Sequence, residues 1–159
     1  MRRLGPVIAT LVFTLLLTSC STSKTDKVSE NSQPSKAQAT PSCSKDEFVG
    51  GSKWITGQLN AFRKGTLEEA YSFASPSFRQ SNGFELFSFL IVGQYSMLLT
   101  SKSFQISSCE RTGSKFFFTG SLVDNQNNEY TLQYLLSLTD KKWGVDGAQV
   151  VKKRNRIDY

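Results

Sequence analysis

The hydrophobic pattern of the chain changes at Thr100, and this change restricts the possible folds more than any other feature. Over residues 130–138 large apolar residues occupy every second position, and Thr131, Gln133 and Ser137 lie between them. Such alternation is typical of a strand with one buried face. Segments 103–110, 115–123 and 143–151 are also strand-like, and short polar turns separate the four. The sequence therefore predicts a four-stranded antiparallel meander.

Glycines in the last of these segments predict curvature. Gly144 and Gly147 lie within three residues of each other in segment 143–151. Glycine inside a strand often marks a bulge or a sharp bend. We therefore expect a curved sheet with one aromatic-rich face that needs a cover.

The segment before Thr100 has helical spacing and can provide that cover. Ser44 and Glu47 form a capping box, which predicts a helix start. The glycine pair at 50–51 weakens the first turns, so we expect the firm helix to begin near Ser52 and to end at Gly65. Its apolar residues recur at helical spacing: Phe48, Ile55, Leu59 and Phe62.

Two further helices are predicted before the sheet. A second capping box at Thr66 begins a helix over 67–74, which Pro76 stops. Segment 84–95 is apolar on nearly every side, which predicts the central helix of a buried core, with a partner-binding helix as the alternative. Helices followed by strands indicate the α+β class, with N-terminal helices packed on a curved four-stranded meander.

The N-terminal segment predicts export. Arg2 and Arg3 precede an apolar run over 7–17, which is shorter than the roughly 20 residues of a membrane-spanning helix. Leu17-Thr18-Ser19-Cys20 resembles the bacterial lipobox. The resemblance implies cleavage after residue 19 and a lipid on Cys20, which would hold the protein on the extracytoplasmic side of a membrane of the bacterial cell envelope. An ordinary cleaved signal with a nearby cysteine is the alternative.

The remaining boundaries follow from composition. Residues 20–44 are polar and contain no aromatic residue, so we interpret them as a flexible tether. Residues 45–151 form a single α+β domain in this interpretation. Residues 152–159 form a basic tail, which either contacts anionic lipid or is a solvated end.

Cysteine usage predicts one disulfide. The chain has three cysteines, and a lipid on Cys20 leaves Cys43 and Cys109 as an even pair. Exported proteins meet oxidising conditions in which such pairs form. We predict a bond that ties the start of the domain to its first strand. Two buried free thiols are the alternative.

Composition argues against several classes of function. The chain contains no histidine, which removes histidine-dependent acid–base chemistry and histidine metal sites. The net charge of +6 comes without a dense basic stripe, so we expect no nucleic-acid partner. We predict no cofactor, no metal ligand and no catalytic residue.

Three segments carry a further resemblance. The chain resembles domain of unknown function 4864 in segments 58–65 (QLNAFRKG), 70–79 (AYSFASPSFR) and 142–147 (KWGVDG). Phe87 and Tyr95, between the second and third segments, also belong to this resemblance. That family is similar to the nuclear transport factor 2-like superfamily, and the resemblance implies a cone of helices packed into a curved sheet. It implies no activity, because none is assigned to the family.

Cones of that superfamily often hold an apolar pocket, so the resemblance implies a ligand site. Its predicted lining is Tyr71, Tyr95, Tyr134, Trp143 and Asp146. We expect a non-catalytic module that binds a small apolar ligand or an envelope protein. One alternative is a structural protein, including a homodimer packed through an exposed sheet face. Another is a pocket enzyme of the isomerase or dehydratase type, with Asp146 as base and a tyrosine, Tyr130 among them, as proton donor.

Overall fold

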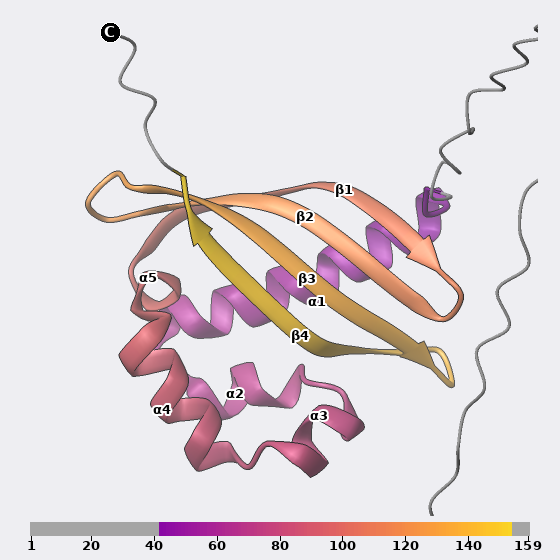
Figure 1. The fold of residues 1–159 in the computed structure, drawn as a ribbon, viewed down its shortest axis with the longest axis horizontal. Coiled ribbons are helices and arrows are strands. Elements are labelled where there is room, and N and C mark those ends of the chain that lie inside the picture. The colour runs from indigo at the N-terminus through magenta and orange to yellow at the C-terminus, as the bar shows by residue number, and fades with distance from the viewer. Residues whose placement is uncertain (1–41, 154–159) are drawn as a thin grey trace, which may run out of the picture. The chain divides into compact units, whose positions relative to one another are not determined.

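The computed structural model describes residues 42–153, in which helices precede a four-stranded sheet (Figure 1). The strands are joined in the order β1-β2-β3-β4, and each pair is antiparallel. The predicted α+β class and the meander are therefore confirmed. The elements are α1 (Lys45–Lys64), α2 (Leu67–Ser72), α3 (Pro76–Ser81), α4 (Phe84–Gln94), α5 (Ser96–Leu99), β1 (Ser101–Thr112), β2 (Lys115–Asp124), β3 (Glu129–Thr139) and β4 (Lys142–Lys152).

Helix α1 begins earlier than the sequence indicated. The predicted capping box is present: the Glu47 amide donates to Ser44 Oγ at 3.3 Å, and the Ser44 amide donates to Glu47 Oε2 at 2.8 Å. Gly65 ends the helix in the left-handed conformation, with φ of 73°. The expected weak start near the glycine pair is wrong, because Gly51 is buried against the Phe118 ring and tertiary packing stabilises the first turns.

The core lies between α1 and one face of the sheet (Figure 1). Ile55, Leu59 and Phe62 of α1 are buried there. The strands contribute alternate residues, as their pattern predicted. These are Phe116, Phe118, Leu122, Tyr130, Leu132, Tyr134 and Leu136. Burial of this apolar surface is the main favourable contribution to folding.

Helix α4 is not the central buried helix that its composition predicted. Only Phe87 and Ile91 are buried, whereas Leu86, Phe89 and Val92 are 49%, 70% and 57% exposed. The central place belongs to α1, which lies along the sheet, while α4 packs on α2 and α5 (Figure 1). An apolar helix with one covered face leaves the other face unpartnered.

The second predicted capping box does not form. No backbone amide donates to the Thr66 hydroxyl within the described residues. The hydroxyl lies instead 3.1 Å from the Ala61 carbonyl oxygen and 2.8 Å from Glu69 Oε2. Thr66 thus ties the end of α1 to the start of α2, and the local capping pattern is overridden by the preceding helix.

The predicted bulge in β4 is present. Leu135 pairs with Gly147 and Leu136 pairs with Val145, which leaves Asp146 as the extra residue. Gly144 is required here by close approach, because a Cβ atom at this position would lie 2.7 Å from the Ser75 Cα.

Cys43 and Cys109 are joined by a disulfide, as predicted. Their Cα atoms are 5.5 Å apart, and the Cys43 amide also donates to the Cys109 carbonyl at 3.3 Å. Ser42 pairs with Glu110 beside them. The bond therefore fixes the residues before α1 to β1.

The predicted signal and Cys20 lie in residues 1–41, which are outside the described residues. Residues 154–159 are also outside them. Among the helices of residues 42–153, none combines the length and the apolar character that crossing a membrane would require.

Candidate functional site

A cavity of about 200 Å³ lies between the helices and the sheet, and we call it the interior cavity. Its lining is mostly apolar, and none of the lining side chains from the described part of the chain carries a charge. The lining residues are Gln58, Phe62, Ala74, Phe78, Phe87, Leu90, Ile91, Tyr95, Leu98, Tyr134, Val145, Gly147, Ala148 and Val150.

Helical and strand spacing place these residues on common faces. Gln58 and Phe62 lie one turn apart on α1, and Phe87, Leu90 and Ile91 share one face of α4. The strands contribute smaller side chains. Ala148 stands opposite Tyr134 in the β3–β4 pair, where a larger side chain would fill part of the space.

Two polar side chains line the interior cavity from buried positions. Gln58 donates an amide N–H to the Ala70 carbonyl at 3.0 Å. Burial raises the pKa of the Tyr134 hydroxyl, so this group is a neutral donor at physiological pH. None of the hydrogen bonds found within residues 42–153 uses the Tyr134 hydroxyl, which leaves it available to a bound molecule.

Of the five residues predicted to line a pocket, the structure brings Tyr95 and Tyr134 together in the interior cavity. Tyr71 is outside its lining: its hydroxyl donates to the Asn82 carbonyl at 2.7 Å, and its ring packs on Phe84. Trp143 is also outside the lining and meets Phe116 edge-on, with ring centroids 4.8 Å apart. Tyr71 and Trp143 thus support the helices and the sheet.

Asp146 does not line the interior cavity either. It lies in the β4 bulge, where Lys115 Nζ is 2.6 Å from Asp146 Oδ2 and Ser137 Oγ donates to Oδ1 at 3.2 Å. Desolvation acts to raise the pKa of Asp146, but hydrogen bonds and the charge of Lys115 outweigh it and hold the pKa below its usual value. A carboxylate stabilised in this way is a weak base.

Tyr130 is used in the turn between β2 and β3. Its hydroxyl donates to Asp124 Oδ2 at 2.9 Å. Burial, and to a lesser extent the contact with Asp124, raises the pKa of Tyr130. Desolvation acts to raise the pKa of Asp124, but hydrogen bonds to its carboxylate outweigh this effect and lower the pKa to about 2. The donors are the side chain and backbone amide of Asn128, the Tyr130 hydroxyl and the Gln126 backbone amide. The pair therefore stabilises the turn.

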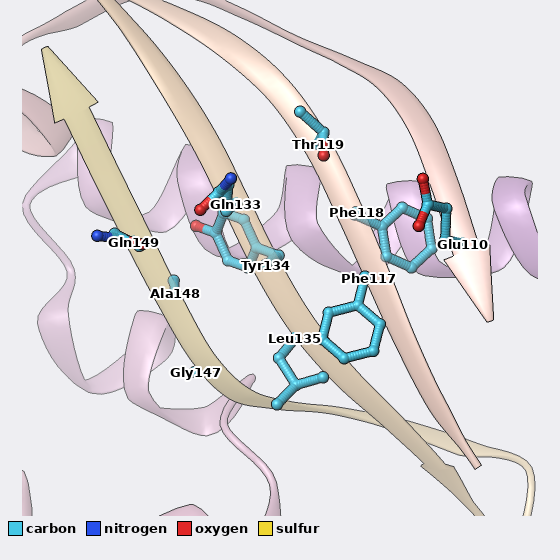
Figure 2. Close-up of a pocket in the computed structure, with 10 residues that line it drawn as sticks. All are labelled: Glu110, Phe117, Phe118, Thr119, Gln133, Tyr134, Leu135, Gly147, Ala148 and Gln149. Atoms are coloured by element: carbon cyan, nitrogen blue, oxygen red, sulfur yellow. The ribbon is translucent and has the colours of Figure 1, made fainter. Parts of the chain in front are cut away.

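A second, larger hollow of about 500 Å³ opens on the sheet, and we call it the sheet-face hollow (Figure 2). Its side chains Phe117, Thr119, Gln133 and Leu135 alternate with buried ones and so point away from α1. This site was not predicted from the sequence, since polar alternation usually indicates a solvated face. The full lining is Glu110, Phe117, Phe118, Thr119, Gln133, Tyr134, Leu135, Gly147, Ala148 and Gln149.

Over residues 42–153, no three histidine, cysteine, aspartate or glutamate side chains gather closely enough to share an ion.

Comparisons with known proteins give a family. No curated protein matches the chain in sequence. Among solved structures, the chain is similar to a SEC-C motif-containing protein of Rhodopseudomonas palustris, at 9% identity and a TM-score of 0.42, over 60% of this chain and 74% of that one. The model of a domain of unknown function, DUF4864, matches residues 51–157. The chain therefore belongs to the family of domain of unknown function 4864.

Proposed function

We propose that the domain binds a small, mostly apolar ligand in the interior cavity. The observation that carries this proposal is an uncharged, mostly apolar cavity whose lining includes Tyr134, a residue whose hydroxyl takes part in none of the hydrogen bonds of residues 42–153. An engineered apolar cavity of about 150 Å³ in another protein accepts benzene. The volume of about 200 Å³ therefore suits a single ring or a short branched chain, with one polar group directed to Tyr134.

The same lining favours binding over catalysis. Proton transfer needs a group of suitable pKa within hydrogen-bond reach of the reacting atom. Within the described range 42–153, no carboxylate or amine lines the interior cavity, and Asp146 is paired with Lys115 outside it. An isomerase or dehydratase would have to obtain its base elsewhere.

The arrangement of α1 on the sheet, with a bulge in β4, also supports our proposal that the fold is a cone of the nuclear transport factor 2-like kind. In such a cone the interior cavity occupies the space between the helices and the curved sheet.

The cavity can be tested with phenol and toluene, two probes of similar size in which phenol carries a hydroxyl where toluene carries a methyl group. A ligand that binds only the folded state adds about 1.4 kcal/mol of stability at ten times its Kd. We expect both probes to raise the melting temperature of the full chain, and phenol to do so at lower concentration. Tyr134→Phe is expected to remove the preference for phenol and keep the response to toluene.

Matched variants on β4 locate the response. Val150 lines the interior cavity, whereas the neighbouring Val151 is exposed on the other face. Val150→Phe should fill the cavity and abolish the effect of both probes, and Val151→Phe should leave it intact. A melting temperature that neither probe changes, or that Val151→Phe alters as much as Val150→Phe, would contradict the proposal.

We also propose that Cys20 carries lipid and anchors the protein outside the cytoplasm. Two acyl chains anchor stably, since each buried methylene adds about 0.8 kcal/mol. Cys20→Ser is expected to move the protein from the membrane fraction to the soluble fraction and to stop metabolic labelling with palmitate. Ser23→Ala is the control and should remain membrane-bound and labelled. Retention of Cys20→Ser in carbonate-washed membranes would refute the anchor.

A further inference from the structure

We propose that the sheet-face hollow binds a neutral glycan chain, with Phe117 as the surface on which a sugar ring stacks. The hollow shares the lining residues Tyr134, Gly147 and Ala148 with the interior cavity. The side chains proposed to contact the glycan lie on the other face of the sheet, away from α1, and require no ligand in the interior cavity. Phe117 is 46% exposed and forms part of the lining of a hollow of about 500 Å³. A sugar presents an apolar C–H face and a rim of hydroxyls, and the hollow offers an aromatic ring for the first and polar side chains for the second.

The strand register places an apolar row beside a polar row. Across neighbouring strands Phe117 pairs with Glu110 on one side and with Leu135 on the other. Two residues further along β2, Thr119 pairs with Gln133, which pairs in turn with Gln149. Figure 2 shows Phe117 and Leu135 close together, with Gln133 and Thr119 beyond them. Successive rows on one face lie about 6.7 Å apart, so a ring stacked on Phe117 brings its hydroxyls within reach of the amide row.

The polar groups around the ring are free to bind. None of the hydrogen bonds found within residues 42–153 uses the side chain of Glu110, Gln133 or Gln149. An amide side chain both donates and accepts, as a sugar hydroxyl does. The Glu110 carboxylate accepts from a hydroxyl in a charge-assisted hydrogen bond. Covering the exposed Phe117 ring removes apolar surface from water.

The charges on this face select a neutral ligand. Among residues 42–153, Glu110 is the one charged side chain in the lining of the sheet-face hollow. The nearest cation on the same face in the described chain, Lys115, is paired with Asp146 at 2.6 Å. Phosphate-rich polymers bind through several lysines or arginines, which the hollow does not provide. The charges on this face therefore disfavour nucleic acid or another polyanion, whereas the aromatic ring and the amide row match an uncharged, hydroxylated chain.

The test uses the full chain with two soluble probes, a tetramer of N-acetylglucosamine and a tetramer of glucose linked as in cellulose. We expect isothermal titration to detect binding of at least one probe, with an affinity that is the same in low and high salt. Phe117→Ala should weaken binding at least about tenfold, and Phe117→Trp should retain it. Gln133→Ala should weaken it by about three- to tenfold.

Val151→Ala is the matched control, because Val151 is also 46% exposed on this face but lies outside the lining of the hollow. It should bind both probes as the natural sequence does. Near-ultraviolet circular dichroism checks that each variant is folded. The proposal is overturned if neither probe binds at millimolar concentration, or if binding survives Phe117→Ala unchanged. If neither probe binds, sedimentation shows what covers the face instead. A dimer that Phe117→Ala dissociates would make it an interface between two copies.

Discussion

Replacing Gly120 by alanine is expected to destabilise the domain by at least about 3 kcal/mol, an unusually large effect for one added methyl group. A Cβ atom at this position would lie 2.3 Å from the Gln105 carbonyl oxygen and 3.1 Å from Ile106 Cδ1. The first of these atoms belongs to the backbone of the paired strand, so no side-chain rotation relieves the overlap. The strands β1 and β2 have to separate locally, with loss of ladder hydrogen bonds.

The close approach has an identifiable origin in β1. The β1–β2 register shifts between Ile106 and Ser108, and Ile106 stands opposite Gly120. A bulge of this kind bends the strand and increases its twist, which here carries the Gln105 carbonyl toward β2. Glycine at 120 is thus required by contact with the neighbouring backbone.

Urea unfolding of both forms measures the effect. The midpoint of Gly120→Ala should fall strongly with little change in the slope m. Gly93→Ala is the control, since a Cβ at Gly93 of α4 meets nothing within 4 Å. Alanine is the better helix former by about 0.5–1 kcal/mol, so this control should raise the midpoint. Equal midpoints for Gly120→Ala and the natural sequence would show that the strands are not this close in solution.

Local chemistry explains which parts of the fold were predictable. The Ser44 capping box, the left-handed Gly65 and the β4 bulge each depend on a few neighbouring residues, and all are present. The bulge in β1 has no such signal, because Ser107 is an ordinary strand residue. The burial of α4 was also out of reach, since an apolar helix does not encode which of its faces finds a partner.

The sites were harder to predict than the fold. Tyr95 and Tyr134 line the interior cavity together, but nothing in their spacing separates them from Tyr71, whose hydroxyl serves the backbone of Asn82. Cavity volume depends on where small residues such as Ala148 face large ones, which requires the strand register. The sheet-face hollow depends on cross-strand neighbours in the same way, because Phe117 and Gln133 belong to different strands.

Removing the disulfide is the second change with a large expected effect. Cys43 and Cys109 are 66 residues apart in sequence. In the chain-entropy model, a closed loop of this length restricts the unfolded chain enough to stabilise the folded state by roughly 4 kcal/mol. That is a large part of the 5–15 kcal/mol that a typical domain has. The double variant Cys43→Ala and Cys109→Ala should therefore unfold at a much lower urea concentration.

Alanine is preferred to serine at position 109 because Cys109 is buried, and a hydroxyl there would need a partner. The natural sequence treated with a reducing agent should behave like the double variant, and Cys20→Ser should keep the full stability. The slope m should also rise when the bond is absent, because an unlinked chain exposes more surface on unfolding. A reducing agent that shifts neither the midpoint nor m would show that the two thiols are not bonded in solution. Loss of stability with m unchanged would place the effect in the folded state, where the bond holds Ser42 and the start of α1 against β1.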